Sequence, residues 1–421
     1  MVREVLPMGT LPMRGGSNRG DTLHAFRRRR TRPARYHAPV HEPRLPEPAG
    51  GLPFPLRMAG LRPERAALLR AALDPAAAAG LALTGATFDA AATRRLAPAI
   101  AARALEAGAA DAALEPFVAQ LRASAARWLR FRAMLQRIGE ALGAAGVAWL
   151  PIKGADVATR VYPDPAERPA SDLDILVRPA EREAAFAALE TAGFRRWYPR
   201  NRYTGDFHDR EAHNVLFASP EGLPVEVHYR LWGMVPPAFT AGIHAAAEAA
   251  PELGATALRP ALHHEIVLTA VHAWHTSRPR PLTQLLDIVR LTAKDPCAPG
   301  LAAEAALRHG LQLPTGLVLL DAGVTCGVPE LERSAAPLLA RLRPPERLVL
   351  SRFIRTGEDG VPITAVFLAT LLARRPRRRG PLALVRRLWP HPHVVALSTP
   401  DTLPWWRRRL LATARELRSG R

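Results

Sequence analysis

Residues 168–179 read RPASDLDILVRP. The aliphatic residues at 173 and 175–177 predict a buried β-strand, although Asp172 and Asp174 interrupt them and aspartate is a poor strand former. Because successive strand residues point to opposite faces, both carboxylates project from the same side. Such a pair repels itself unless a cation or a proton is present. The pattern indicates a strand with a chemical role, and a solvent-facing edge strand is the alternative.

Acidic pairs with this spacing occur elsewhere in the chain, but in different surroundings. One begins an expected helix, one lies in a polar loop and one follows a proline: Glu181/Glu183, Asp209/Glu211 and Glu330/Glu332. Only the pair at 172 and 174 is set among large aliphatic residues. This setting distinguishes it from an ordinary solvated pair.

A hairpin pattern follows later in the chain. Residues 213–219 (HNVLFAS) and 224–231 (PVEVHYRL) read as two strands joined by a Pro-Glu-Gly turn, which predicts an antiparallel hairpin. Glu226 lies in the second strand between two valines. Alternation places His228 on the face of Glu226 and Tyr229 on the other face.

If the second hairpin strand pairs beside the aspartate strand, Asp172, Asp174 and Glu226 form one cluster. Three hard oxygen donors with open positions suit Mg²⁺, which prefers carboxylates and substrate phosphates as ligands. Two such ions can clamp the attacking and leaving oxygens of a displacement at phosphorus. These three residues are therefore the candidate metal ligands and catalytic residues.

A candidate phosphate site precedes the aspartate strand. Residues 147–152 (VAWLPI) predict a short buried strand that leads into Lys153 and Gly154 and then a short helix. Such a turn offers free backbone N–H groups and a cation to a phosphate. Lysine is rare in this chain, where arginine far outnumbers it, so its presence here mildly favours a role for a compact charge; chance placement is the alternative.

Two further residues before the aspartate strand are candidates for nucleotide contact. Arg168 is expected to bind a phosphate or a carboxylate, with a simple turn salt bridge as the alternative. Ser171 directly precedes the acidic pair and belongs to the same expected nucleotide site.

The remaining chain is mostly helical in pattern, so we expect an α+β protein with a small mixed sheet flanked by helical domains. One long helix is indicated by apolar residues at helical spacing: Trp128, Phe131, Leu135, Ile138 and Leu142. The predicted parts are a disordered basic segment (1–57), a helical domain (58–145), a core that contains the small sheet (146–235), a second helical domain (236–373) and a basic amphipathic tail (374–421).

The formal net charge of +20 comes almost entirely from arginine. Because alanine and proline are also abundant, we attribute part of this charge to biased coding and discount it as a sign of nucleic-acid binding. A positive field still favours anionic partners such as nucleotides, RNA or acidic lipid. We interpret the basic N-terminal segment as a solvated tail or as the product of a misassigned gene start. Contact with nucleic acid is the less favoured interpretation. The C-terminal tail, residues 374–421, is expected to pack its tryptophans on the helical domain. Peripheral contact with a membrane is the alternative.

Cysteine content and hydropathy bound the cellular setting. Cys297 and Cys326 are too few for a disulfide framework or a zinc site, which fits a reducing cytoplasm. The longest apolar run, residues 361–373, is too short to cross a membrane. We therefore expect a cytoplasmic protein without a transmembrane segment.

The stretch KGADVATRVYPDPAERPASDLDILV, followed by VEVHYRLW, resembles the bacterial uncharacterised nucleotidyltransferase family of the polymerase beta superfamily. The resemblance implies that the superfamily's metal triad corresponds to Asp172, Asp174 and Glu226. It implies that the phosphate-binding Gly-Ser turn corresponds to Lys153-Gly154, where Asp156 takes the place of a nearby serine.

A looser resemblance covers a later helical stretch, residues 271–275 (VHAWH) and 285–291 (LLDIVRL), which are similar to the family's later His and Asp positions. His264, His272 and His275 are expected on one helical face. Structural histidines are favoured over metal ligands there, and Asp287 is a candidate to orient one of them.

Together these features predict an enzyme that moves a nucleoside monophosphate from an NTP, with ATP expected, to an acceptor and releases pyrophosphate. Two Mg²⁺ ions are the expected cofactors. The alternatives are a sugar-nucleotide glycosyltransferase that uses the Asp-x-Asp motif, which leaves Glu226 without a role, and a non-catalytic protein that binds RNA or another partner. The acceptor, whether peptide, metabolite, RNA or protein, is left open.

Overall fold

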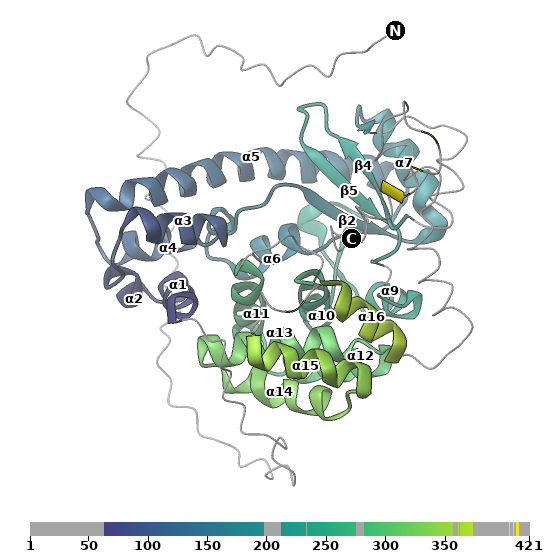
Figure 1. The fold of residues 1–421 in the computed structure, drawn as a ribbon. Coiled ribbons are helices and arrows are strands. Elements are labelled where there is room, and N and C mark those ends of the chain that lie inside the picture. The colour runs from purple at the N-terminus through teal and green to yellow at the C-terminus, as the bar shows by residue number, and fades with distance from the viewer. Residues whose placement is uncertain are drawn as a thin grey trace, which may run out of the picture. The chain divides into compact units, whose positions relative to one another are not determined.

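The centre of the computed structural model is a five-stranded mixed sheet in the order β1-β2-β5-β4-β3 (Figure 1). Only the β2–β5 pair is parallel, and the other three pairs are antiparallel. This confirms the expected small mixed sheet and the hairpin. The strands are β1 (Trp149–Pro151), β2 (Leu173–Val177), β3 (Arg195–Arg196), β4 (Asn214–Ala218) and β5 (Pro224–His228).

The structure describes residues 63–197, 212–232, 234–274, 282–356, 361, 363–373, 404, 407 and 410–411. All of them fall within one unit, Leu52–Arg421. The predicted segment 1–57 lies outside the described residues, as does most of the predicted tail 374–421, so both remain predictions.

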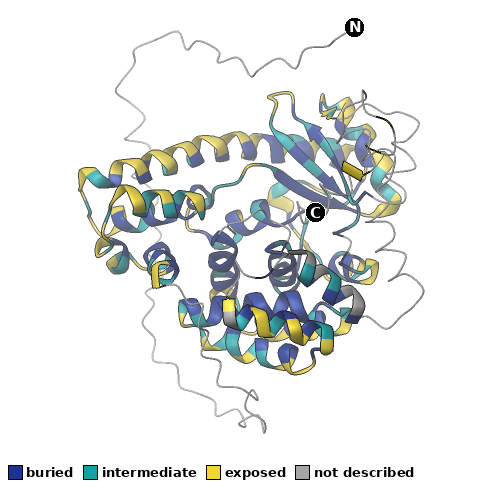
Figure 2. Cartoon of the chain, in the orientation of Figure 1, coloured by how far each residue is buried: buried dark blue, intermediate teal, exposed yellow. Residues whose placement is uncertain are grey.

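The long helix predicted from apolar spacing is α5 (Glu115–Ala144). The five residues that define its apolar face are all buried, which confirms the prediction. Gly146 follows the helix with a φ of +65°, a conformation that glycine adopts without strain, and turns the chain into β1. The opposite face of α5 is exposed (Figure 2).

Successive side chains of β2 point to opposite faces of the sheet, and different helices pack on each face. Leu173, Ile175 and Val177 join one core cluster with residues of α5 and of α7 (Arg182–Thr191). Leu176 joins a second cluster with residues of α10 (Leu262–His272) and α11 (Thr283–Lys294). Asp174 shares the face of Leu176, so it lies on the side of the sheet toward the later helices.

Helices account for most of the residues that the structure describes. Before the sheet come α1 (Pro63–Leu73), α2 (Pro75–Ala79), α3 (Gly85–Thr93) and α4 (Ala97–Glu106), and between β1 and β2 lies α6 (Gly154–Val161). After it come α9 (Pro237–Ala245), a ribbon of β6 (Glu248–Ala249) and β7 (Leu258–Arg259), α10, α11, α12 (Ala298–His309), α13 (Gln312–Cys326), α14 (Pro329–Ala340), α15 (Pro344–Thr356) and α16 (Ile363–Ala373). Short 3₁₀ turns are Ala112–Leu114, Pro165–Glu167, Pro179–Glu181 and Pro251–Leu253.

Several element boundaries differ from those the sequence predicted. Asp172 directly precedes β2 and is not part of it. The helix expected to begin at the Glu181/Glu183 pair is preceded by a 3₁₀ turn, Pro179–Glu181, since proline fits a first helical turn without supplying an N–H. Helix ends are the least sharply specified part of a periodic pattern.

Among the helices that the structure describes, none combines the length and the hydropathy of a membrane span. The apolar run noted in the sequence corresponds to α16, which has 11 residues. A spanning helix needs about 20.

Candidate active site

The register of the sheet brings the strand carboxylates together. In the parallel β2–β5 pair, Asp174 lies opposite Glu226, and Leu176 lies opposite His228. Because β5 alternates as β2 does, Asp174, Glu226 and His228 share one face. The hairpin strand β5 thus pairs beside the aspartate strand β2, which the sequence had left as a condition.

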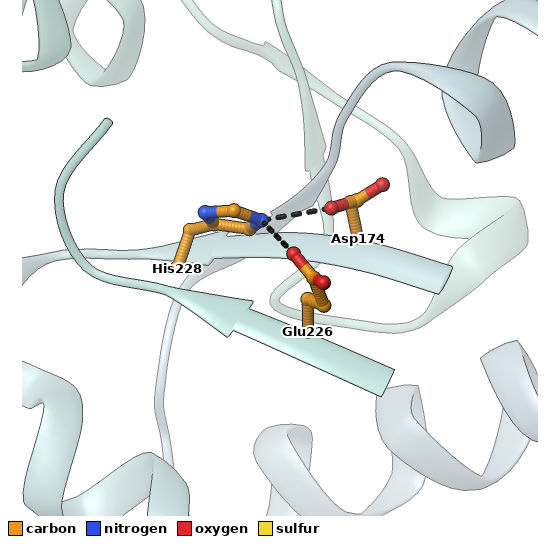
Figure 3. A group of neighbouring side chains, drawn as sticks. All are labelled: Asp174, Glu226 and His228. Carbon is orange, nitrogen blue, oxygen red and sulfur yellow. Dashed lines mark hydrogen bonds and ion pairs between the residues drawn. The ribbon is translucent and has the colours of Figure 1, made fainter. Parts of the chain in front are cut away.

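Asp174, Glu226 and His228 each offer a ligand atom within 4.8 Å of the other two (Figure 3). His228 Nε2 lies 2.8 Å from Asp174 Oδ1 and 3.3 Å from Glu226 Oε2. Asn214 Nδ2 donates to Glu226 Oε2 at 2.7 Å and orients that carboxylate. We did not predict His228 as part of the group, although the Glu-x-His alternation placed it on the correct face.

Asp172 lies beside this group without joining it. It is half-buried, and its Oδ1 accepts a hydrogen bond from Ser171 Oγ at 3.1 Å. Burial raises the pKa of Asp172, and the charges of Asp174 and Glu226 raise it further. The three predicted carboxylates thus act on one another electrostatically, which is the expected behaviour of acids that share a site.

Lys153 provides the positive charge next to these acids. Its Nζ donates to Asp174 Oδ1 at 2.5 Å, lies 3.4 Å from His228 Nε2 and lies 4.9 Å from the centroid of the Trp232 ring. Burial alone would raise the pKa of Asp174, but the Lys153 charge and the His228 contact outweigh it and hold that pKa well below its usual range. Asp174 is therefore ionised although it is only 6% exposed.

The backbone at Lys153 is strained, with a φ of +54° in a residue other than glycine. Its N–H donates to Glu265 Oε1 at 3.0 Å, which ties the turn to helix α10. From the sequence we predicted that Lys153 contacts a triphosphate. In the structure its ammonium group donates a hydrogen bond to Asp174, and its backbone directly precedes α6.

Glu265 is a buried acid that we did not single out from the sequence. It is fully buried, and among the described residues its Oε2 has no hydrogen-bond partner. Burial raises the pKa of Glu265 well above its ordinary value, and the charge of Asp156 adds to the effect. A lone acid within the apolar helix 262–272 was the available signal.

We expect Glu265→Gln to stabilise the protein increasingly as pH rises. The unfolded carboxyl loses its proton near 4.5, whereas the folded carboxyl keeps it to higher pH. Above that value the folded wild type binds more protons than the unfolded chain, so its stability falls with pH, while the non-titrating variant is spared this loss. Urea unfolding at about pH 5 and about pH 8 measures the difference. A stability difference that stays constant or shrinks with pH contradicts the assignment.

Arg168 and Asp287 form a buried pair between the sheet region and α11. Arg168 Nε and Nη2 donate to the two oxygens of Asp287 at 2.8 and 2.7 Å, and the Tyr162 hydroxyl donates to Asp287 Oδ1 at 2.7 Å. The Asp287 carboxylate and these bonds raise the pKa of Arg168 despite its burial. Arg168 is therefore a carboxylate partner. Asp287 contacts Arg168 and Tyr162, and the prediction that it orients a histidine remains a prediction.

Gly154 leaves room for the close approach of this same arginine. A Cβ at position 154 would lie 2.6 Å from Arg168 Nη1. The third guanidinium nitrogen therefore lies against the first residue of α6, while the other two bind Asp287. Asp156, also in the first turn of α6, accepts hydrogen bonds from Arg259 at 2.6 Å and from Arg160 at 3.4 Å.

The histidines of α10 are not gathered into a metal site among the described residues. His264 packs on Phe239 with ring centroids 5.4 Å apart, and burial lowers its pKa to about 4, with His263 adding to the effect. His272 stacks on Trp232 at 5.3 Å with an interplanar angle of 14°. His275 lies outside the described residues.

A sequence profile of the uncharacterised nucleotidyltransferase family matches residues 85–323, more than half of the chain. The chain belongs to this family. The matched range contains every residue of the site described above, from Lys153 to Asp287. The protein is therefore an enzyme of the nucleotidyltransferase class, as the sequence predicted.

No curated protein matches the chain. A solution structure of the antibiotic-resistance factor ANT(2'')-Ia matches with 13% identity and a TM-score of 0.31, over 43% of this chain and 93% of that one. A likeness at this level carries no argument about fold or function, so the family match stands on the sequence profile alone.

Proposed function

We propose that this nucleotidyltransferase transfers a nucleoside monophosphate from an NTP, with ATP as the expected donor, to an acceptor hydroxyl in a Mg²⁺-dependent reaction. The observation that carries the proposal is the register of β2 and β5, which sets Asp174 opposite Glu226 on one face. Asp172, Asp174 and Glu226 are the proposed metal ligands.

The chemistry of the donors fits a hard divalent cation. Two carboxylates and an imidazole offer atoms within 4.8 Å of one another, and the pKa of nearby Asp172 is raised by burial and by the charges of Asp174 and Glu226. One ammonium, from Lys153, offsets part of this negative charge. When bound, Mg²⁺ would neutralise the remaining charge and polarise the phosphoryl oxygens.

The phosphates are proposed to lie at the start of β2. Pro151 pairs with Ile175 in the antiparallel β1–β2 pair, so the Lys153-Gly154 turn lies beside that end of the strand. The N-terminus of α6 favours an anion, and Arg168 Nη1 lies against it. Ser171 also lines a cavity of about 230 Å³ with the exposed Arg95 and Arg127. These groups support Lys153, Gly154, Arg168 and Ser171 as nucleotide contacts.

The reaction forms a bond from the acceptor oxygen to the α-phosphorus and breaks the bond from that phosphorus to the bridging oxygen of pyrophosphate. The acceptor proton goes to Glu226, the more exposed of the two strand carboxylates, whose side chain is 29% exposed and held by Asn214. Lys153 keeps Asp174 ionised before the substrates bind. The chain has only two cysteines, Cys297 and Cys326, which favours a reducing cytoplasm as the setting.

The test is the fate of labelled ATP. Purified protein, Mg²⁺ and small-molecule or macromolecular extract fractions are incubated with ATP labelled at the α- or the γ-phosphorus. We expect label from the α position in an acceptor, label from the γ position only in pyrophosphate, and loss of transfer with EDTA. Label from the γ position in the acceptor indicates a kinase. Absence of ATP binding contradicts the proposal and favours the non-catalytic binding protein.

A further inference from the structure

A cavity of about 740 Å³ is lined by residues that follow the carboxyl ends of β2 and β5 and by residues of helix α9. Its lining includes Arg178, His213, Tyr229, Arg230 and residues along α9. Its volume falls within the range of about 300–1,000 Å³ that is usual for small-molecule sites. We call this cavity the α9 pocket.

The α9 pocket and the Lys153-Gly154 turn lie at opposite ends of the same strand. The turn lies beside the start of β2, whereas Arg178 follows the last residue of β2 and Tyr229 the last residue of β5. The Asp174–Glu226 pair lies between the two ends. This order suits transfer between a donor at one end and an acceptor at the other.

The pocket is also in contact with the carboxylate site through two stacked imidazoles. The ring of His213, in the pocket wall, stacks on that of His228 with centroids 5.6 Å apart. His228 Nε2 in turn lies 2.8 Å from Asp174 Oδ1. A molecule that contacts His213 in the pocket is therefore separated from Asp174 by two imidazole rings.

The lining has a definite chemical character. Arg178 and Arg230 contribute two guanidinium groups, and no acidic residue lines the pocket within the described part of the chain. Arg178 forms an ion pair with Glu181, with 3.3 Å between Nη1 and Oε1. The guanidinium of Arg230 lies over the Tyr229 ring, 5.8 Å from its centroid. The remaining wall is largely apolar, with Leu231 and other aliphatic residues. Such a surface disfavours a polycationic ligand and suits an anion with an apolar body.

His244 on α9 adds polar capacity to this wall. Both of its ring nitrogens are buried and lack a hydrogen-bond partner of good geometry among the described residues. Burial and the charge of Arg178 lower the pKa of His244 to about 4, so its imidazole is neutral near pH 7. A neutral imidazole offers both a donor and an acceptor, for example to a hydroxyl.

We propose that the α9 pocket binds the acceptor and that the acceptor is a small molecule with an apolar body, a carboxylate or phosphate that contacts Arg230, and a hydroxyl directed toward Glu226. This inference rests on the proposed nucleotidyl transfer for its functional meaning. The binding chemistry itself can be tested without the reaction.

The test compares two probes that share a phenol skeleton and differ in charge: phloretate carries a carboxylate, and tyramine carries an ammonium. Each is titrated into the full chain without nucleotide and followed by ligand-observed NMR and calorimetry. We expect phloretate to bind about tenfold or more tightly than tyramine, because Arg230 pairs only with the anion. Equal binding, or a preference for tyramine, overturns the proposal.

Three variants locate the binding. Ala241→Trp fills the pocket from α9 and is expected to abolish phloretate binding, whereas Ala238→Trp, an exposed residue of the same helix outside the lining, is expected to preserve it. Arg230→Gln is expected to weaken phloretate about tenfold and leave tyramine unchanged. Phloretate binding that survives both Ala241→Trp and Arg230→Gln places the site elsewhere and contradicts the proposal.

Binding of ATP with Mg²⁺ is measured in the same variants and is expected to remain at the wild-type level. This separates the two proposals. If phloretate binding follows the prediction but the wild type transfers no label from ATP, the proposed function fails and the pocket stands. If label is transferred from ATP but the substitutions do not change phloretate binding, the pocket assignment is wrong and the proposed function is retained.

Discussion

Asp174→Asn is expected to reduce transfer of α-label by about 10³-fold or more, since it removes the central charge of the proposed metal site. Asp174 is buried, lies opposite Glu226 and binds both Lys153 and His228. Asparagine keeps the shape of the side chain but cannot carry a negative charge. The measurement is the initial rate of label transfer to the acceptor fraction that is active with the wild type.

The matched control is Glu183→Gln, which neutralises an acid in another i, i+2 pair. Glu183 lies in the first turn of α7, and its side chain is 56% exposed. Its rate is expected to equal that of the wild type. If Asp174→Asn retains a rate within about tenfold of the wild type, Asp174 is not a metal ligand of the reaction.

Asp287→Ala is expected to lower the free energy of unfolding by about 3–5 kcal/mol, because it leaves a buried guanidinium without its counter-ion. The carboxylate is fully buried, accepts two hydrogen bonds from Arg168 and one from Tyr162, and joins α11 to the segment before β2. Urea unfolding of the full chain measures the loss.

The control for this change is Asp89→Ala, since Asp89 is exposed on α3. That substitution is expected to alter the unfolding free energy by no more than about 0.5 kcal/mol. A loss of less than about 1 kcal/mol for Asp287→Ala contradicts the structural role given to the pair, because breaking a buried ion pair costs more than this.

The elements that carry the site were predictable because their signals are local. The alternation in 173–177 and 224–228 specifies strands, and the spacing from Trp128 to Leu142 specifies a helix, whatever the rest of the chain does. The pairing of Asp174 with Glu226 was stated only as a condition, since strand order depends on contacts across 52 residues of sequence that no local pattern records.

The partners of the charged residues were not predictable for the same reason. Arg168 binds Asp287, which lies 119 positions later in the sequence. Lys153 binds Asp174 through its ammonium, 21 positions away, and Glu265 through its backbone N–H, 112 positions away. Which of several acids pairs with a given cation depends on how the helices pack on the sheet. His228 is different: its alternation with Glu226 was visible, and only its part in the ligand group was overlooked.

The most direct test of the central claim is anomalous diffraction from crystals grown with Mn²⁺, in place of Mg²⁺, and a non-hydrolysable ATP analogue. We predict a manganese peak in coordinating contact with the carboxylates of Asp174 and Glu226, with the triphosphate between the metal and the Lys153-Gly154 turn. Saturating Mn²⁺ that gives no peak at these carboxylates, or a triphosphate bound away from them, would contradict the account.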